Sequence, residues 1–311
     1  ESWVAYHLGI GFAHLFIFFD DPTELDVVGL HRRFPSERVS CVPHDAKLRA
    51  AWMELPQAQR TVNAAYLEHA AREVQTRQQL NAWHAVRLAL ARGLDWLLHI
   101  DADELFYAGA GVDAGAHFGA LSAANVATFC YLNHEAVPEV HGIADPFREV
   151  TLFKRSLELV DRSPAAEAAV RFWETRQAAF FHYYDNGKAA VRLAPMARPL
   201  SVHEWLPGSA DAMRRWFSNL SMHWRGRGDL GNVVQYMASH ACILHYPCCN
   251  VDALWVRWKR GNDNCARSAA ACEARPAPSL PPVALTGCVA LARADRLGGK
   301  EDPALVTAFV E

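Results

Sequence analysis

The stretch WLLHIDADELFY, residues 96–107, decides the expected fold class of this chain. Four of its first five residues, Trp96, Leu97, Leu98 and Ile100, are apolar, which is typical of a short strand buried on both faces of an α/β sheet. Three acidic side chains follow almost directly, at Asp101, Asp103 and Glu104. Ligands of open α/β sheets bind at the carboxyl ends of the strands. We therefore expect a binding site in this Asp-x-Asp-Glu loop.

Acidic side chains this close together need a cation. Hard oxygen ligands favour Mg²⁺ or Mn²⁺ over zinc, and such an ion keeps open positions for water and substrate phosphate oxygens. We expect Asp101 and Asp103 to bind this ion, and the chemistry to involve a phosphate. The alternative is that both aspartates cap a helix or lie in a solvated loop, as is common for Asp-x-Asp pairs. The preceding strand and the aromatic residues Phe106 and Tyr107, which can pack beneath the loop, favour the metal site.

The sequence around this stretch alternates between helical and strand patterns. Residues 3–10 have apolar side chains at helical spacing and lead into the apolar run HLFIFF at 14–19. Residues 37–43 predict a second strand, and residues 57–92 predict one or two amphipathic helices that end at Gly93. This alternation predicts an α/β sheet with helices on its faces.

Length, composition and charge narrow the class of protein. The chain has 311 residues, of which 51% are hydrophobic, so it can bury a large single core. A formal net charge of −3 provides no basic field, and we expect no nucleic-acid partner. No apolar stretch is long enough to span a bilayer, so we expect a membrane anchor, where one exists, only upstream of Glu1.

The eight cysteines do not follow a zinc-site pattern, because no CxxC pair is present. Cys130 lies in an apolar run and is expected to be a buried thiol. The five cysteines from Cys242 to Cys272 could form disulfides if the protein is secretory. The sequence does not choose between these states.

Five segments, in the expected order, resemble glycosyltransferase families 2 and 92. Residues 1–21 resemble their opening helix and strand, and residues 77–106 resemble their long helix followed by the acidic loop. The other three are LNHEAVPE at 132–139, TLFKR at 151–155, and NGKAAVRL with SVHEW between 186 and 205, which resemble acceptor-side segments. On this resemblance we expect a GT-A glycosyltransferase domain over residues 1–260, truncated before a first strand that would lie upstream of Glu1. Residues 261–311 are expected to be a peripheral linker.

The resemblance also implies an activity. It implies metal-dependent transfer of a hexose, such as galactose, from a UDP-sugar to a glycan or other hydroxyl acceptor, with inversion at the anomeric carbon. Mn²⁺ or Mg²⁺ would be held by Asp101, Asp103 and His245, because a late histidine completes the metal shell in many GT-A enzymes. If the source is eukaryotic, the implied location is the lumen of the Golgi or secretory pathway.

The sequence also contains candidate catalytic residues and candidate residues for binding the nucleotide sugar. Glu135 is our candidate for the general base that activates the acceptor hydroxyl, and Glu104 is a second catalytic candidate. The candidates for nucleotide-sugar binding are Asp20, Asp21, Arg77, Lys188, Arg192 and His203. Ordinary alternatives stay open for these: a turn for the aspartates, solvation or a hairpin turn for the cations, and a hydrogen-bonded core residue for the histidines.

Two other classes of protein also stay open. A non-catalytic relative that binds a nucleotide sugar or a glycan would retain the fold without turnover. A metal-dependent phosphohydrolase would also place clustered acids beside a strand, but it would need a second set of metal ligands or a nucleophile. The sequence contains no second cluster of this kind.

Overall fold

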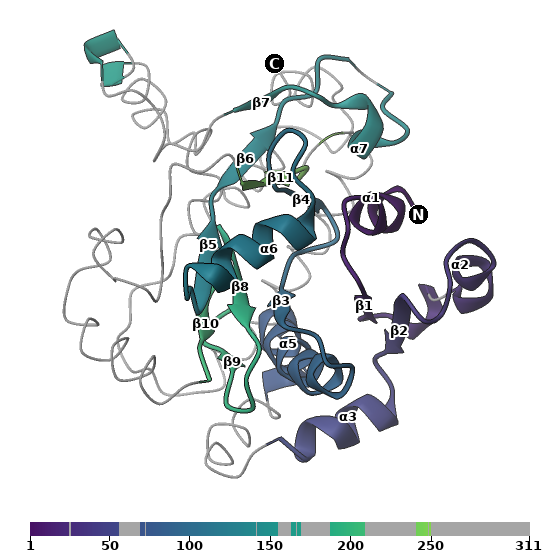
Figure 1. The fold of residues 1–311 in the computed structure, drawn as a ribbon. Helices are drawn as coiled ribbons and strands as arrows, with labels where there is room; N and C mark the ends of the chain where they lie inside the picture. Colours follow the sequence, from purple (N-terminus) through teal and green to yellow (C-terminus); the bar gives the residue numbers. More distant parts are fainter. Residues whose placement is uncertain are drawn as a thin grey trace, which may run out of the picture. The chain divides into compact units, whose positions relative to one another are not determined.

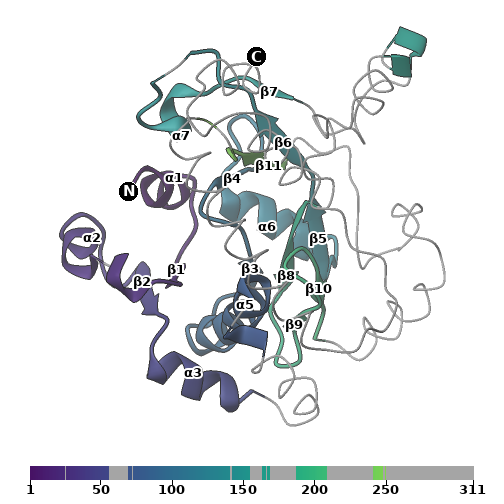
Figure 2. The same cartoon turned by 180° about the vertical axis from the view of Figure 1, so that it is seen from behind.

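In the computed structural model, the chain forms two compact units. Figures 1 and 2 show its helices and strands from opposite sides. The structure describes residues 1–24, 26–55, 69–71, 73–140, 142–154, 163–165, 167–168, 187–208, 241–247 and 249. Unit 1 comprises residues 1–133 and 186–244, and unit 2 comprises residues 134–185 and 245–311. Within these described stretches, no helix is both long and apolar enough to cross a membrane. The expected boundary at residue 260 stays a prediction, because residues 250–311 lie outside the described part.

Unit 1 begins with two parallel strands, each preceded by a helix. The elements are α1 (Ser2–Gly9), β1 (Leu15–Phe19), the 3-10 helix η1 (Pro22–Glu24), α2 (Val27–Arg33), β2 (Val39–Pro43) and α3 (Ala46–Met53). Leu15 of β1 lies opposite Val39 of β2, and the pairing continues to the ends of both strands. The side chains of Asp26 and Asp45 cap α2 and α3, each accepting a hydrogen bond from a backbone N–H three residues further on.

The second part of unit 1 contains an antiparallel sheet in the order β3-β8-β5. The elements are α5 (Val74–Ala91), β3 (Trp96–Leu98), β4 (Glu104–Tyr107), α6 (Ala114–Ala123), β5 (Thr128–Tyr131), β8 (Lys188–Arg192), β9 (Arg198–Pro199), β10 (Trp205–Leu206) and β11 (Cys242–His245). β8 is the central strand, with Leu97 opposite Val191 on one side and Cys130 opposite Ala189 on the other. β9 pairs with β10, and β4 lies next to β11.

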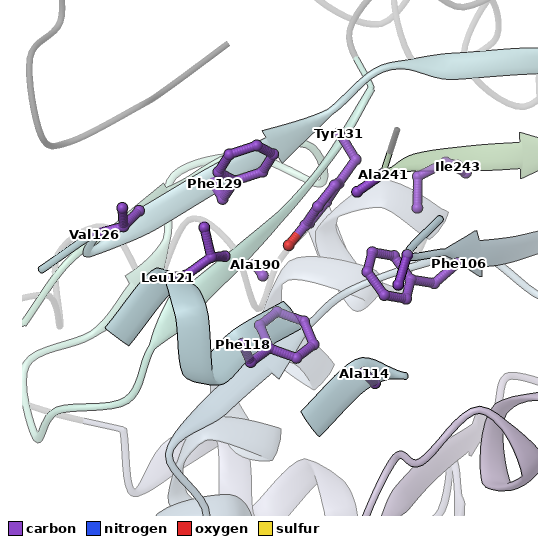
Figure 3. Close-up of a cluster of buried hydrophobic side chains, with 11 residues drawn as sticks. Phe106, Ala114, Phe118, Leu121, Val126, Phe129, Tyr131, Ala190, Ala241 and Ile243 are labelled. Carbon is purple, nitrogen blue, oxygen red and sulfur yellow. The ribbon is translucent and has the colours of Figure 1, made fainter. Parts of the chain in front are cut away.

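Helices cover both faces of these strands. Trp96 and Leu98 of β3 pack against a core that contains Phe118 of α6, and Figure 3 shows this core with Phe129 and Tyr131 of β5. Leu97 points to the other face, where it packs with residues of α5 and β8. β3 accordingly lies between α6 and α5 in both views (Figures 1 and 2).

The two faces of β1 are likewise covered by different helices. Ile17 packs with Val4 of α1, whereas Phe18 packs on the other side with Leu48 of α3 and Leu80 of α5. Unit 1 is thus built in α/β/α layers, with α1 and α6 on one side and α3 and α5 on the other. The expected α/β class is confirmed.

Unit 2 contains a short antiparallel pair of strands. Its described elements are β6 (Asn133–Ala136), which begins at the last residue of unit 1, α7 (Pro146–Glu149) and β7 (Phe153–Lys154). Glu135 of β6 lies opposite Lys154 of β7. Tyr246 packs edge-on against Phe147 and Phe153, at ring-centroid distances of 4.9 and 5.4 Å. Aromatic packing therefore ties the short helix and strand together.

Most expected elements in the described part are confirmed, with one correction. The runs at 14–19 and 37–43 form β1 and β2, and the long helix ends at Ala91, ahead of Gly93. Residues 56–68 of the expected helical region lie outside the described part. The expectation that the strand at 96–100 is buried on both faces is wrong, because all three residues of β3 are only half-buried. The edge of β3 that faces away from β8 lines a cavity, which leaves these side chains partly accessible.

Candidate functional site

The acidic loop lies at the carboxyl end of β3, as expected. The chain turns between Asp101 and Glu104, where the Glu104 N–H donates to the Asp101 carbonyl oxygen at 3.2 Å. The Asp101 N–H in turn donates to the Glu104 side chain, Oε2, at 2.8 Å. These two bonds close the turn, and the second also fixes the direction of the Glu104 carboxylate.

Lys188 is the cation of this loop. It is the first residue of β8 and is 1% exposed, and its Nζ lies 2.7 Å from Asp101 Oδ2 and 3.7 Å from Glu104 Oε2. Burial alone lowers the pKa of Lys188, but the Glu104 and Asp101 carboxylates outweigh it, so the pKa is raised. Burial alone raises the pKa of Asp101, and the Lys188 ammonium more than offsets it, so this pKa is lowered. Both groups are therefore charged at neutral pH, and Lys188 is not the solvated side chain of the alternative interpretation.

Glu104 lies inside the loop. It is 1% exposed, and its Oε1 accepts a hydrogen bond from Asn133 Nδ2 at 3.2 Å. Its backbone carbonyl accepts a hydrogen bond from Trp3 Nε1 at 2.7 Å. With Oε2 bonded to the Asp101 N–H, both carboxylate oxygens have partners within the protein. This placement favours a role in positioning the loop over direct contact with a substrate.

The start of α5 connects the ends of β1 and β3. Arg77 binds Asp20 in a bidentate manner, with Nε to Oδ1 at 2.5 Å and Nη2 to Oδ2 at 2.7 Å. The next residue, Gln78, donates from Nε2 to Asp101 Oδ1 at 2.9 Å. Four candidates from separate parts of the sequence, Asp20, Arg77, Asp101 and Lys188, are thus linked at one edge of unit 1. Asp20, Arg77, Gln78 and Asp101 also line a cavity of about 590 Å³.

Three other candidates for nucleotide-sugar binding lie apart from these contacts or have local roles. Asp21 accepts hydrogen bonds from the N–H and hydroxyl of Thr23, at 2.8 and 2.6 Å, which is the turn role of the alternative interpretation. Arg192 is exposed at the opposite end of β8 from Lys188. His203 Nδ1 donates to the Gly187 carbonyl at 2.7 Å and so supports the residue before Lys188.

The structure adds His99 and Asn133 to the site. Burial and the nearby Lys188 ammonium lower the pKa of His99 to about 4, so its imidazole is neutral at neutral pH. Asn133 binds Glu104, as described above. The position of His99, directly after β3 and two residues before Asp101, was a signal in the sequence. The sequence contained no such signal for Asn133, because only the tertiary fold brings this residue to the loop.

Glu135 and His245 form a buried pair in unit 2. His245 Nδ1 lies 2.8 and 2.9 Å from the two oxygens of the Glu135 carboxylate, and the residues are 2% and 7% exposed. The candidate base and the candidate histidine ligand therefore contact each other. A histidine that donates from Nδ1 to a carboxylate can bind a metal only through Nε2.

The acidic loop fits a divalent metal in one specific way. Within the described residues, no group of three or more His, Cys, Asp or Glu side chains is arranged to hold a metal ion. Mg²⁺ and Mn²⁺ can, however, bind through one or two carboxylates when substrate phosphates complete the shell. Asp101 binds Gln78 and Lys188. Asp103 is half-buried in the same turn and close enough to raise the pKa of Lys188 further. Asp103, with Asp101 beside it, is the donor set that fits.

These features define an α/β protein with a charged site at the carboxyl end of a strand. The chain is similar to two proteins of Arabidopsis thaliana. It is 31% identical over 144 residues to "Glycosyltransferase-like At3g57200", covering 43% of this chain and 26% of that protein. It is 30% identical over 144 residues to "Glycosyltransferase-like At2g41451", covering 43% of this chain and 30% of that protein. The match thus spans less than a third of either relative, and both relatives support a glycosyltransferase family.

Two further comparisons found no counterpart. No protein-family model matches the chain, and no solved structure matches it.

Proposed function

We propose that the chain belongs to a glycosyltransferase that takes a sugar from a nucleotide donor. The observation that carries this proposal is the acidic loop, with Asp101 ion-paired to buried Lys188, beside a cavity at the carboxyl end of β3. The names of the two relatives support the same activity. The parallel pair β1 and β2 followed by this loop is compatible with a GT-A arrangement of the family 92 type, which we propose on the resemblance.

The protein's own groups have distinct roles in this proposal. Lys188 keeps Asp101 ionised, and Gln78 fixes the other oxygen of the same carboxylate. Arg77 and Asp20, at the same edge, would contact the ribose or base of the nucleotide. When Mn²⁺ or Mg²⁺ is bound by Asp103 and Asp101, it would neutralise charge on the departing diphosphate. The lowered pKa of Asp101 keeps this carboxylate available for such binding at neutral pH.

We propose Glu135 as the group that accepts the proton of the acceptor hydroxyl. The Glu135 carboxylate accepts a hydrogen bond from His245 Nδ1, which orients it and leaves lone pairs for a second donor. A hydroxyl in that second position would lose its proton to Glu135 as the glycosidic bond of the donor breaks. A UDP-hexose such as UDP-galactose as donor, a glycan as acceptor and inversion at the anomeric carbon complete the proposal, all on the resemblance.

The ion pair of Asp101 with Lys188 also favours a second candidate function. A protein-supplied cation already neutralises one of the expected metal ligands, and this would suit a relative that binds a nucleotide sugar without turnover. Such a relative would bind UDP but would not release it from UDP-sugars.

UDP release from a panel of UDP-sugars, with Mn²⁺ or with EDTA, tests both functions. We expect one preferred donor, a requirement for metal, and a loss of at least 100-fold in the Asp103→Asn variant. Asp26→Asn is the matched control, because Asp26 caps α2 and Asn is an equally good cap. UDP binding without release would support the binding relative, and hydrolysis of simple phosphate esters would support a phosphohydrolase. If the chain neither binds UDP nor releases it, the proposal is wrong.

A further inference from the structure

Ser40 of β2 belongs to a hydrogen-bonded cluster at the amino end of the parallel strand pair. It lies directly opposite Phe16 of β1, and His14 precedes Phe16 by two residues, so the three side chains lie on one face. Asp20, by contrast, follows the carboxyl end of β1. The cluster is therefore at the opposite end of these strands from the contact between Asp20 and Arg77.

The hydrogen bonds of this cluster assign a place to each proton. The Nδ1 atom of His14 lies 2.9 Å from the carbonyl oxygen of Glu37, and because a carbonyl can only accept, Nδ1 carries the proton. The Nε2 atom, 2.9 Å from Ser40 Oγ, therefore has a lone pair in the neutral ring and accepts the hydroxyl proton. Arg92 has only donors, and its Nη2 donates to the same Ser40 oxygen at 3.2 Å. Ser40 thus has a base for its proton and a cation at its oxygen.

The two groups around the Ser40 hydroxyl are charged as a nucleophile needs and are held in place. Burial lowers the pKa of His14 below its ordinary value of 6.5; the hydrogen bond to the Glu37 carbonyl offsets this only in part, and the Arg92 guanidinium lowers the pKa further. The imidazole is therefore a neutral base at pH 7. The Phe16 ring lies 4.5 Å from the His14 ring between centroids, and the Arg92 Cζ atom lies over it, 5.3 Å from its centroid.

We propose that Ser40 is a nucleophile with His14 as its general base, and that with Arg92 they hydrolyse small carboxylic esters. A histidine that is oriented through one ring nitrogen and accepts a serine proton at the other is the arrangement that activates serine for acyl transfer. The Glu37 carbonyl here takes the place of the usual carboxylate. Ser40 and His14 are half-buried and Arg92 is exposed, so a small ester can reach the hydroxyl. The half-buried Phe16 ring offers an apolar contact for a short acyl chain.

The hydrolysis would take two balanced steps. In the first, Ser40 Oγ bonds to the carbonyl carbon of the ester and its proton passes to His14 Nε2. The bond from that carbon to the alcohol oxygen breaks, and the alcohol leaves with the proton from His14. In the second step, water attacks the acyl-serine and gives a proton to His14, which returns it to Ser40 Oγ as the carboxylic acid leaves. In both steps the Arg92 guanidinium donates to the oxygen on which negative charge develops.

A fluorophosphonate probe tests the nucleophile, because attack of a serine oxygen on its phosphorus displaces fluoride and leaves a stable adduct. We expect a single label on the full wild-type chain, which peptide mass spectrometry should locate on Ser40. The chain should also hydrolyse p-nitrophenyl butyrate. Ser40→Ala should lose both reactions. His14→Gln should slow both by about 100-fold or more, because Gln can accept the Ser40 hydrogen bond but takes up no proton.

Two controls separate this site from ordinary surface serines and from glycosyl transfer. Ser36→Ala removes an exposed hydroxyl of the same segment, which donates to the Glu37 carboxylate at 3.3 Å, and it should keep both labelling and turnover. Both reactions are measured in EDTA without UDP-sugar, so a failure of the proposed glycosyl transfer would not affect them. Absence of labelling or of turnover in the wild type, persistence of either in Ser40→Ala, or unchanged rates in His14→Gln would overturn the inference.

Discussion

The geometry of the acidic loop depends on the ammonium group of Lys188. Its side chain is 2% exposed, and it is paired with one carboxylate of equal burial, Glu104, and with one that is 31% exposed, Asp101. Removing one member of a buried ion pair leaves an uncompensated charge, which costs more than the pair contributes. The loop geometry is therefore sensitive to the charge at position 188.

We expect Lys188→Met to lower the free energy of unfolding by about 3 kcal/mol, since it leaves Asp101 and Glu104 without their counter-ion. The estimate is at the low end of the usual range because Asp101 is partly exposed. Urea unfolding at pH 7 measures the change. Arg192→Met on the same strand is the control, because Arg192 is exposed and its loss should change stability by no more than about 0.5 kcal/mol. Equal losses for both variants would contradict the counter-ion role.

His7 predicts a pH dependence of stability. Its Nδ1 donates to the Trp3 carbonyl at 2.8 Å, and its Nε2 accepts the Phe106 N–H at 3.2 Å. Burial lowers the pKa of His7 to about 4, from the ordinary value of 6.5. The unfolded chain therefore binds a proton that the folded chain excludes. Stability from this group is complete above pH 6.5, falls by up to about 1.4 kcal/mol per pH unit below it, and levels off below pH 4.

Urea unfolding of the wild type and of His7→Gln between pH 7.5 and pH 4 checks this dependence. The difference between the two proteins isolates His7, because other titrating groups contribute to both curves. We expect the stability gap to be largest at pH 7 and to narrow as the pH falls. A gap that is the same at every pH would show that His7 does not titrate in this range.

At the scale of elements, the turn into β8 depends on Gly187. This residue has a φ of 65°, and a Cβ at this position would overlap the carbonyl oxygen of Tyr131. β8 pairs with both β3 and β5, so a displaced turn would disturb the whole three-stranded sheet. Only glycine fits both the backbone conformation and the close approach.

We expect Gly187→Ala to destabilise the protein at least twice as much as Gly93→Ala. Gly93, which follows α5, also has a positive φ, 68°, but an added Cβ there meets nothing within 4 Å. Gly93→Ala should therefore cost only the backbone term of about 1 kcal/mol. Chemical denaturation measures both variants, and similar losses would mean that the approach to Tyr131 is relieved by a small shift of the turn.

The elements with local sequence signals could be predicted, and those with distant partners could not. β1, β2 and the end of α5 follow from apolar periodicity and from Gly93, which act within a few residues. The antiparallel insertion of β8 between β3 and β5 joins segments far apart in the sequence. For this reason the sequence identified Lys188 as a candidate but not its burial or its pairing with Asp101. Asp20 and Arg77 were likewise separate candidates, and only the fold shows that they bind each other.

At the scale of the whole molecule, the candidate donor site and the candidate base lie in different units. Asp101 and Asp103 belong to unit 1, and the Glu135–His245 pair belongs to unit 2. The two functions should therefore be separable by mutation.

We expect Glu135→Gln to lower the rate of sugar transfer by 100-fold or more while leaving the affinity for UDP unchanged, because it removes the proton acceptor only. Asp103→Asn should instead remove the metal-dependent part of UDP binding. Calorimetry of UDP binding with Mn²⁺ or EDTA, together with transfer kinetics, distinguishes these outcomes. A loss of UDP affinity in Glu135→Gln would place this residue in donor binding and argue against its role as the base.

The bidentate contact between Arg77 and Asp20 has a consequence for how a ligand could enter. The Asp20 side chain is 53% exposed, so water and salt screen its attraction to the Arg77 guanidinium. The Arg77 guanidinium also donates from Nη1 to the Ala70 carbonyl at 2.8 Å, so it stays in place when Asp20 moves. Arg77 can thus exchange its carboxylate for another anionic or hydroxyl group at little cost. Because salt screens the ion pair, the ease with which a ligand replaces Asp20 at this edge of unit 1 depends on the ionic strength of the surroundings.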